Sequence, residues 1–343
     1  MPTAITITRM TMPIREPLVD RFGRVHTYLR VSVTDRCNLR CVYCMPSEGF
    51  EHVERDEILT YEEILRVVRL MAEIGIHKVR VTGGEPLVRK GLANLIAGIV
   101  ATPGIETVAM TTNAVLLAEQ AESLKRAGLS HLNISLDTLR ADRFEAISRR
   151  ANLREALAGI EAAIRSGFDP IKLNMVVMGG VNDDELLDFV ELARHRPIQV
   201  RFLEFMPFKS NGWDQGTLVS YAEMRRRIEE QYDLIPLFIP DGPADVTKEF
   251  AIPGFEGTIG FITSMTEDFC KDCNRIRLLA DGSLKSCLFH PPEENLRAAL
   301  RRGTSDDEVE GLIRRCVSAK LEKHEELEEL IRLENNPMIA IGG

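Results

Sequence analysis

The sequence has few aromatic residues, no long apolar run and no excess of positive charge. Only 6% of its 343 residues are aromatic, and the formal net charge is −9. No apolar run approaches the roughly 20 residues that a membrane-spanning helix needs, and the first residues lack the charged start and apolar block of a secretory signal. These absences argue against membrane insertion, secretion and nucleic-acid binding, and they favour a cytoplasmic location.

The seven cysteines do not form a pattern typical of disulfides. Their number is odd, and the chain is long and shows no signal sequence, so a disulfide framework is not expected. Six of them form two groups of three, which is more typical of metal binding or redox chemistry. The first group is Cys37, Cys41 and Cys44, and the second is Cys270, Cys273 and Cys287. Cys316 stands alone on an apolar helical pattern, and we expect it to be a buried thiol.

Short apolar runs alternate with amphipathic stretches through the first two thirds of the chain. Strands are predicted at residues 29–33, 78–82, 107–111, 132–136, 171–178 and 198–205, and most are followed by a helical pattern. Six strand-then-helix steps predict an α/β fold, a partial (βα)6 barrel of the TIM type, with its active site at the carboxyl ends of the strands. We expect an N-terminal arm at residues 1–28, the barrel at 29–206, and a C-terminal extension at 207–343.

The first cysteine group has the spacing C-x3-C-x2-C and begins a few residues after a predicted strand. Three thiolates can hold three irons of a [4Fe–4S] cube and leave the fourth iron open. The same spacing could place three small residues on one helical face, but Arg36, Asn38, Arg40 and Pro46 argue against a buried helix. A structural zinc site would need a fourth ligand, and no nearby histidine has a suitable spacing.

The stretch from Val33 to Pro46, which contains this group, closely resembles the signature of S-adenosylmethionine (SAM) radical enzymes. The resemblance implies that the open iron binds SAM and that Tyr43 lies beside the adenine. The segment from Val81 to Pro86, VTGGEP, is similar to the glycine turn of the same superfamily, in which the backbone at Gly84 would contact the methionyl amino group. Alone, a Gly-Gly pair shows only that backbone can approach a ligand closely.

The remaining strand ends are the segments 111–113 (TTN), 133–137 (NISLD), 172–175 (KLNM) and 201–206 (RFLEFM). Together, and in this order, they resemble the GTP cyclase family of molybdenum-cofactor synthesis. The resemblance implies that Ser135 and Met206 complete the SAM site. It further implies that Arg30, Arg80, Thr111 and Lys172 face GTP. Arginine also suits bidentate contact with phosphate, and cations inside a barrel need an anionic partner of some kind. One departure from the family is Ala114, which stands where the family usually has a glycine.

The second cysteine group has the spacing C-x2-C-x13-C, which by itself leaves zinc open, with His290 as a fourth ligand. The surrounding segment, residues 268–277, resembles the second cluster site of the cyclase family. That likeness implies a second [4Fe–4S] cluster whose open iron faces guanine. It also implies contacts from Arg275, Ile276 and Arg277 to the nucleotide, the two arginines having a catalytic role. The family's C-terminal tail enters the active site, which here would involve Gly342 and Gly343.

The activity that the resemblance implies is the conversion of GTP to 3′,8-cyclo-7,8-dihydro-GTP. A 5′-deoxyadenosyl radical would take hydrogen from C3′ of the ribose, and the carbon radical would attack C8 of guanine. The implied partners are an electron donor such as flavodoxin or ferredoxin and a downstream cyclic pyranopterin monophosphate synthase, and a homodimer is compatible with the family. The alternatives are a peptide-modifying radical SAM enzyme and a zinc-stabilised binding module.

Overall fold

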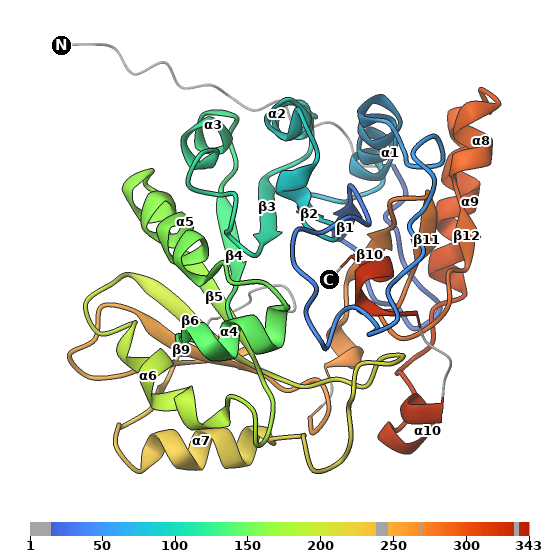
Figure 1. The fold of residues 1–343 in the computed structure, drawn as a ribbon. Coiled ribbons are helices and arrows are strands. Elements are labelled where there is room, and N and C mark those ends of the chain that lie inside the picture. Colours follow the sequence, from blue (N-terminus) through green and yellow to red (C-terminus); the bar gives the residue numbers. More distant parts are fainter. Residues whose placement is uncertain (1–14, 238–245, 268, 333–335, 343) are drawn as a thin grey trace.

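The computed structural model describes residues 15–237, 246–267, 269–332 and 336–342, and it is organised around one twelve-stranded sheet. The strand order is β12-β11-β10-β1-β2-β3-β4-β5-β6-β9-β8-β7. Figure 1 shows this sheet curving round an interior, with helices on its outer side and the C-terminus inside.

The elements have the following bounds. The strands are β1 (Tyr28–Ser32), β2 (Lys78–Thr82), β3 (Thr107–Thr112), β4 (His131–Ser135), β5 (Ile171–Val177), β6 (Ile198–Glu204), β7 (Ile235–Pro236), β8 (Thr247–Ala251), β9 (Thr258–Ile262), β10 (Arg275–Leu278), β11 (Ser283–Lys285) and β12 (Glu294–Asn295). The α-helices are α1 (Tyr61–Glu73), α2 (Leu92–Val100), α3 (Ala121–Arg126), α4 (Ala141–Ser148), α5 (Leu153–Arg165), α6 (Leu186–Glu191), α7 (Tyr221–Glu229), α8 (Arg297–Arg301), α9 (Asp306–Ser318) and α10 (Leu327–Arg332). Four short 3-10 helices are η1 (Pro86–Val88), η2 (Asp183–Glu185), η3 (Cys270–Asp272) and η4 (Met338–Ile341).

The six predicted strands form the continuous parallel run β1 to β6, which confirms the α/β class and agrees with a partial barrel. The C-terminal third adds a parallel strand at each edge of this run, because β10 pairs with β1 and β9 pairs with β6. The expected boundary after residue 206 therefore lies within one continuous sheet. The two edges of the barrel are completed by strands from distant parts of the chain.

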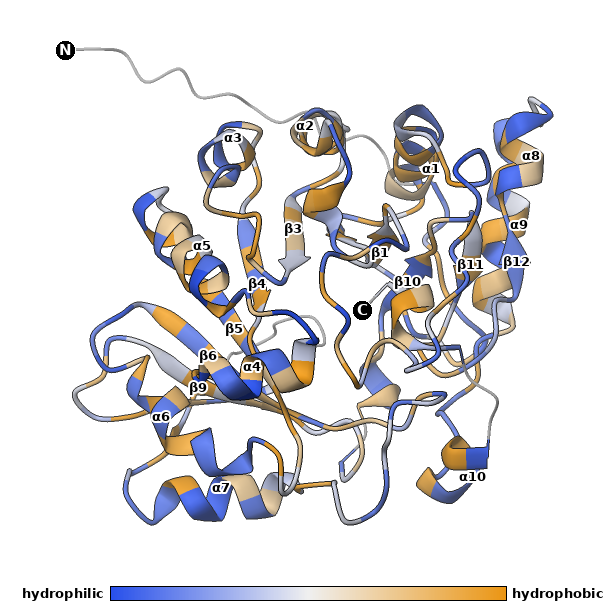
Figure 2. Ribbon diagram, viewed as in Figure 1, coloured by the Kyte–Doolittle hydropathy of each residue, from blue (hydrophilic) through white to orange (hydrophobic). Residues whose placement is uncertain are grey.

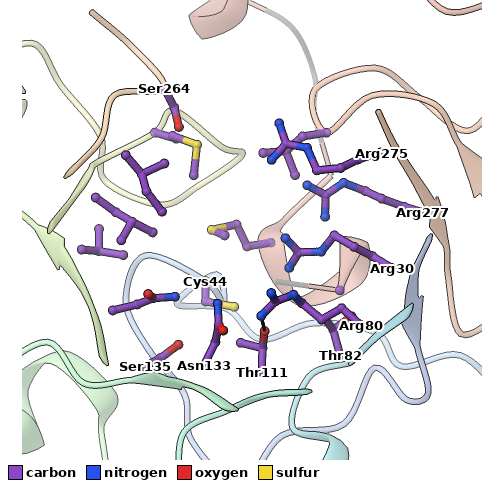
Figure 3. A pocket seen from close by; sticks show the side chains of 18 of the residues that line it. Arg30, Cys44, Arg80, Thr82, Thr111, Asn133, Ser135, Ser264, Arg275 and Arg277 are labelled. Carbon is purple, nitrogen blue, oxygen red and sulfur yellow. Dashed lines mark hydrogen bonds between the residues drawn. The ribbon is translucent and has the colours of Figure 1, made fainter. Parts of the chain in front are cut away.

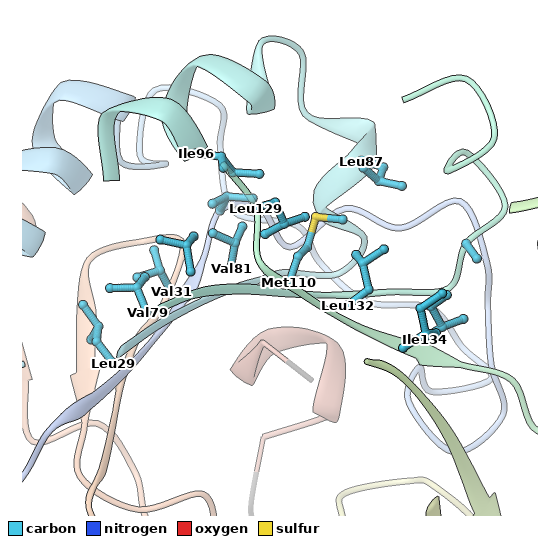
Figure 4. Close-up of a cluster of buried hydrophobic side chains, with 14 of the residues drawn as sticks. Leu29, Val31, Val79, Val81, Leu87, Ile96, Met110, Leu129, Leu132 and Ile134 are labelled. Carbon is cyan, nitrogen blue, oxygen red and sulfur yellow. The ribbon is translucent and has the colours of Figure 1, made fainter. Parts of the chain in front are cut away.

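The outer face of the sheet carries the main hydrophobic core. Residues with β-strand periodicity alternate between the two faces, so Leu29 and Val31 point outward while Tyr28 and Arg30 point inward. Figure 4 shows Val79, Val81 and other strand residues packed beneath the helices, with Ile96 of α2 above them. Figure 2 shows the same division, with apolar helix faces turned to the sheet and hydrophilic faces turned outward.

Local sequence signals fix the start of the first helix. Thr60 and Glu63 form a capping box at α1, because the Thr60 Oγ1 accepts from the Glu63 backbone N–H at 3.2 Å and Glu63 Oε2 accepts from Thr60 N–H at 2.7 Å. Cys316 is fully buried in α9, as expected of a core thiol. In the described part of the chain, no helix combines the length and apolar character that crossing a membrane requires.

Helix α5 packs directly on the turn after β3, and this contact requires a glycine. A Cβ on Gly159 would lie 2.1 Å from the carbonyl oxygen of Ala114. Ala114 itself has a φ of 62°, in the left-handed region that favours glycine, so the unusual residue does sit at a demanding turn. The turn is retained with alanine, whose side chain is buried against α5.

We expect Gly159→Ala to lower the free energy of unfolding by about 1–3 kcal/mol, because the methyl group meets backbone that cannot move away. The matched control is Gly311→Ala in α9, where a Cβ would meet nothing closer than 3.9 Å. That change should raise stability by roughly 0.5–1 kcal/mol, since alanine favours the helix and restricts the unfolded chain. Urea unfolding measures both; equal effects would contradict the tight contact.

Candidate active site

A cavity of about 310 Å³ lies inside the curved sheet. Most of the residues predicted for the site line it together. These are Arg30, Cys37, Cys41, Tyr43, Cys44, Arg80, Gly84, Thr111, Ser135, Met206, Cys270, Cys273, Arg275, Arg277 and Cys287. The structure thus brings both cysteine groups and the four predicted arginines to one chamber, together with Arg201, although they lie up to 250 residues apart in the chain (from Cys37 to Cys287).

The strand register explains why the arginines converge. Arg30 of β1 is paired with Arg277 of β10 on one side and with Arg80 of β2 on the other. Parallel neighbours in register point to the same face of a sheet, and Figure 3 shows these three side chains and Arg275 reaching into the cavity from one wall. Arg80 is further oriented by Tyr28, whose hydroxyl accepts from its Nε, and by Thr111 at 3.5 Å.

The electrostatics of this wall demand an anion. Burial and the neighbouring Arg275 lower the pKa of Arg277 to about 10, and its Nη1 is buried without a hydrogen-bond partner. Burial would raise the pKa of Tyr28, but Arg80 and Arg30 lower it to about 8. Clustered buried cations are costly unless a negatively charged group compensates them. The wall is therefore suited to a phosphate-bearing ligand.

The adjoining wall carries amide and hydroxyl groups that sequence reasoning did not single out. Asn133 of β4 and Asn174 of β5 line the cavity next to Ser135, and the side-chain oxygen of each amide is buried without a partner. The alternation along β4 and β5 could have identified them, because they share the inward face with Ser135 and Lys172. These oxygens can accept hydrogen bonds from the hydroxyl or amino groups of a ligand.

Two predicted residues, by contrast, are not among those that line the cavity. Lys172 lies on β5 in register with Asn133, and Ile276 of β10 is fully buried in the main core between its two arginine neighbours. Gly342 does line the cavity, and Ile339 N–H donates to the carbonyl of Cys44 at 3.3 Å, so the C-terminal tail contacts the first cysteine loop. Gly343 lies outside the described residues.

The first cysteine group lies on an irregular loop at the carboxyl end of β1, which excludes the helical alternative. The loop is fixed to α4, since the N–H groups of Arg40 and Val42 donate to the carbonyls of Ser148 and Ile147, both at 2.9 Å. Burial raises the pKa of Cys37 to about 11 and raises that of Cys41 well above its usual range, with Asp137 adding to the latter. These thiols therefore need a bound metal to become thiolates.

The glycine turn braces this loop from the side. Gly84 N–H donates to the carbonyl of Thr34 at 2.6 Å, and Glu85 N–H donates to that of Arg36 at 2.8 Å. The buried Glu85 carboxylate accepts from Thr112 Oγ1 at 2.7 Å and from Asn113 N–H at 2.8 Å. Its pKa is raised to about 7 by burial, against the effect of these hydrogen bonds. One carboxylate thus joins the ends of β2 and β3 beneath the cysteines.

Tyr43 is held from the opposite side of the loop. Its hydroxyl donates to Asp137 Oδ2 at 2.8 Å, and Val176 N–H donates to the other oxygen of the same carboxylate at 3.0 Å. Asp137 lies two residues beyond the end of β4, and nothing in the sequence indicated that it pairs with Tyr43. The contact fixes the plane of the Tyr43 ring where it lines the cavity.

The second cysteine group lies at the opposite mouth of the barrel. Cys270 and Cys273 directly precede β10, and Cys287 follows β11, which runs antiparallel to β10 and so ends at the same mouth. Burial would raise the pKa of Cys273, but Arg275 and Lys320 lower it to about 6. His290, the alternative zinc ligand, instead pairs with Glu325 at 2.8 Å between Nε2 and Oε2.

Three cysteines in each group are the donor set that an iron–sulfur cube with one open iron takes. Within the described residues, no three His, Cys, Asp or Glu side chains are gathered as one metal ion would require. A tetrahedral zinc needs such a gathering, whereas a cube spreads its thiolates because each binds a different iron. All six cysteines line the cavity, so Cys37, Cys41 and Cys44 would hold one cube and Cys270, Cys273 and Cys287 would hold a second if both groups bind clusters.

We expect Gly84→Ala to abolish iron binding at the first group selectively. A Cβ there would lie 2.4 Å from the carbonyl oxygen of Arg36, so the cysteine loop would have to move away. Iron and sulfide per chain after anaerobic reconstitution should fall by about half if each group holds one four-iron cube. Gly311→Ala is the control, and full iron content in Gly84→Ala would show that the contact is dispensable.

Comparison with known proteins agrees with this arrangement. Residues 31–193 match the Radical SAM superfamily, and residues 198–326 match Molybdenum Cofactor Synthesis C. The GTP 3′,8-cyclase of Pelotomaculum thermopropionicum is 46% identical over 90% of this chain and 95% of its own length. The mitochondrial GTP 3′,8-cyclase of Arabidopsis thaliana is also 46% identical, over 96% of this chain and 85% of its own.

Other relatives are longer, and the fold has solved counterparts. Molybdenum cofactor biosynthesis protein 1 of Homo sapiens is 45% identical over 96% of this chain, which spans about half (52%) of that protein. The SAM-bound crystal structure of SuiB from Streptococcus suis has a TM-score of 0.57 at 14% identity, covering 85% of this chain and 68% of SuiB, and so supports the fold alone. From the two family matches and the cyclase relatives, the chain belongs to the radical SAM superfamily and, within it, to the GTP 3′,8-cyclase family.

Proposed function

We propose that the protein is a GTP 3′,8-cyclase that makes 3′,8-cyclo-7,8-dihydro-GTP for molybdenum-cofactor synthesis. The observation that carries the proposal is the row of Arg277, Arg30 and Arg80, which adjoins both cysteine groups in one cavity. A nucleoside triphosphate supplies the negative charge that this row requires. When bound, the iron–sulfur clusters and SAM supply the 5′-deoxyadenosyl radical chemistry at C3′ of the ribose.

The residues of the chain bind and orient the two ligands. Arg30, Arg80, Arg275 and Arg277 hold the triphosphate, and Tyr28 and Thr111 keep Arg80 in place for bidentate contact. Asn133 and Asn174 accept hydrogen bonds from the nucleotide. SAM is bound at the mouth that holds the first cysteine group, by Tyr43, Gly84, Ser135 and Met206. The reacting atoms then lie between SAM and the nucleotide.

The apolar part of the cavity wall excludes water. Val176, Leu203 and Ile262 come from the strands β5, β6 and β9 and line the chamber opposite the arginines. Excluding water strengthens the charge interactions within the site and protects reactive species from side reactions. The C-terminal tail at Gly342 closes the chamber next to the first cysteine loop.

The proposal includes the partners that this chemistry needs. A low-potential electron donor such as flavodoxin or ferredoxin would reduce the first cluster, and a cyclic pyranopterin monophosphate synthase would consume the product. The oxygen sensitivity expected of open-iron clusters favours the reducing environment of the cytoplasm.

The decisive test is an anaerobic assay of reconstituted protein with SAM, a strong reductant and either GTP or ATP, followed by mass spectrometry. We expect 5′-deoxyadenosine together with a new isomer of GTP, and no product from ATP. Deoxyadenosine without conversion of GTP would favour a peptide-modifying enzyme instead. Zinc in place of iron, with no cleavage of SAM, would overturn the enzyme proposal.

Arg277→Met should separate substrate binding from stability. Loss of a charge-assisted hydrogen bond, about 1.5–3 kcal/mol, raises the KM for GTP by roughly 10-fold or more. The ligand-free protein should melt at a higher temperature, since one buried, partly unpartnered cation is removed. Arg226→Met is the control, because its side chain is 60% exposed on α7 and its ion pairs with Glu223 and Glu230 are surface pairs, which contribute little to stability. It should leave the KM for GTP unchanged and should not raise the melting temperature. An unchanged KM in Arg277→Met would remove this arginine from the substrate site.

A further inference from the structure

A lysine is buried directly behind the second cysteine group. Lys320 follows the end of α9 and is only 3% exposed. Its Nζ lies 3.2 Å from the Sγ of Cys273, 3.2 Å from the carbonyl oxygen of Cys273 and 3.1 Å from that of Arg275. Its fourth neighbour is the Nε2 of His26, at 3.0 Å. Three N–H groups are thus shared among four acceptors.

None of the described partners of Lys320 is a carboxylate. The nearby Asp20 is instead engaged by Arg24, at 2.6 Å between Oδ2 and Nε. A buried ammonium group is costly unless an anion compensates it. Of its four neighbours, only the sulfur can carry negative charge, as the thiolate that ligates iron. The position of Lys320 is therefore explained if Cys273 is a cluster ligand.

His26 can serve only as an acceptor toward this lysine. It is fully buried, its Nδ1 lies 3.0 Å from the carbonyl oxygen of Arg24, and burial followed by the charge of Lys320 lowers its pKa to about 3. The neutral ring therefore donates from Nδ1 and presents the lone pair of Nε2 to Lys320. Two residues before His26, Arg24 donates from Nη1 to the carbonyl oxygen of Cys270 at 2.8 Å.

The first cysteine group has the opposite environment. A buried carboxylate, that of Asp137, is joined to its loop by the Tyr43 hydroxyl, which donates to Oδ2 at 2.8 Å. Hydrogen bonds to the sulfurs and nearby charge are principal determinants of the reduction potential of an iron–sulfur cluster. Cations favour the reduced cluster, which is the more negative state, and carboxylates disfavour it.

We propose that Lys320, oriented by His26, is a positioning residue that fixes the Cys273 thiolate and raises the reduction potential of the second cluster above that of the first. This inference rests on the proposed function, because it takes Cys273 as an iron ligand. Because its potential is higher, the second cluster takes up an electron more readily than the first cluster, which must cleave SAM. Lys320 touches the ligand sulfur and its backbone, and nothing places it on the substrate.

The test compares Lys320→Met, which removes both charge and donor, with Lys320→Gln, which keeps a donor without the charge. Both are made in the full chain, once with all cysteines and once with Cys37, Cys41 and Cys44 replaced by Ala, so that only the second cluster assembles. Anaerobic redox titration followed by EPR gives its midpoint potential. We expect a negative shift in Lys320→Met and a smaller one in Lys320→Gln.

Lys285→Met is the matched control. Lys285 is also fully buried near this site, but its Nζ donates to the carbonyl oxygen of Leu288 at 3.2 Å rather than to a cysteine sulfur. Its substitution should shift the potential less than that of Lys320. An equal shift in both variants would mean that any nearby positive charge has the same effect, and it would overturn the positioning role of Lys320. An unchanged potential in Lys320→Met, with its second cluster intact, would overturn it as well.

Iron content separates failure of this inference from failure of the proposed function. Wild-type protein without iron at Cys270, Cys273 and Cys287 would refute the second cluster itself, and with it the premise. If only Lys320→Met loses that iron, the result would support the role of Lys320 in fixing Cys273. The midpoint potential of the second cluster would then be measured in Lys320→Gln. An unshifted potential in Lys320→Gln would in that case reject the redox role.

Discussion

The register that aligns Arg277, Arg30 and Arg80 on three adjacent parallel strands is the constraint on which the site depends. Like charges side by side on a sheet repel one another, and here they are largely buried as well. The hydrophobic packing of the outer face, where Leu29, Val31 and their neighbours meet the helices, has to compensate for that repulsion. The ligand-free fold therefore contains an unfavourable repulsion between these arginines, which an anionic substrate relieves.

The two mouths of the barrel hold their cysteine segments through different polar networks. At the carboxyl mouth, the buried carboxylates of Glu85 and Asp137 tie the cysteine loop to the ends of the strands. At the amino mouth, the cations Arg24 and Lys320 hold the cysteine segment through its carbonyls and a sulfur. Similar triplets of cysteines thus lie in different polar surroundings, with buried carboxylates beside the first and a buried lysine beside the second.

Much of this arrangement could be predicted from the sequence, because it follows from local patterns. The β-periodicity located the six strands, and the cysteine spacings identified two groups that line one cavity. The pairing of β10 with β1 could not be predicted, since it joins segments almost 250 residues apart (Tyr28 with Arg275) through backbone bonds that carry no sequence signature. For the same reason, nothing in the sequence around Lys320 indicated that it faces Cys273.

The completion of both barrel edges by late segments has a consequence for biosynthesis. Strands β1 and β6 emerge from the ribosome long before β9 and β10, which cover them. Until then, each exposes an unpaired edge of the kind that promotes association between chains. The arginine wall also stays incomplete until Arg277 has been made. A nascent chain therefore cannot bring the two cysteine groups together until β10, β11 and Cys287 have been made, and the cavity stays incomplete up to that point.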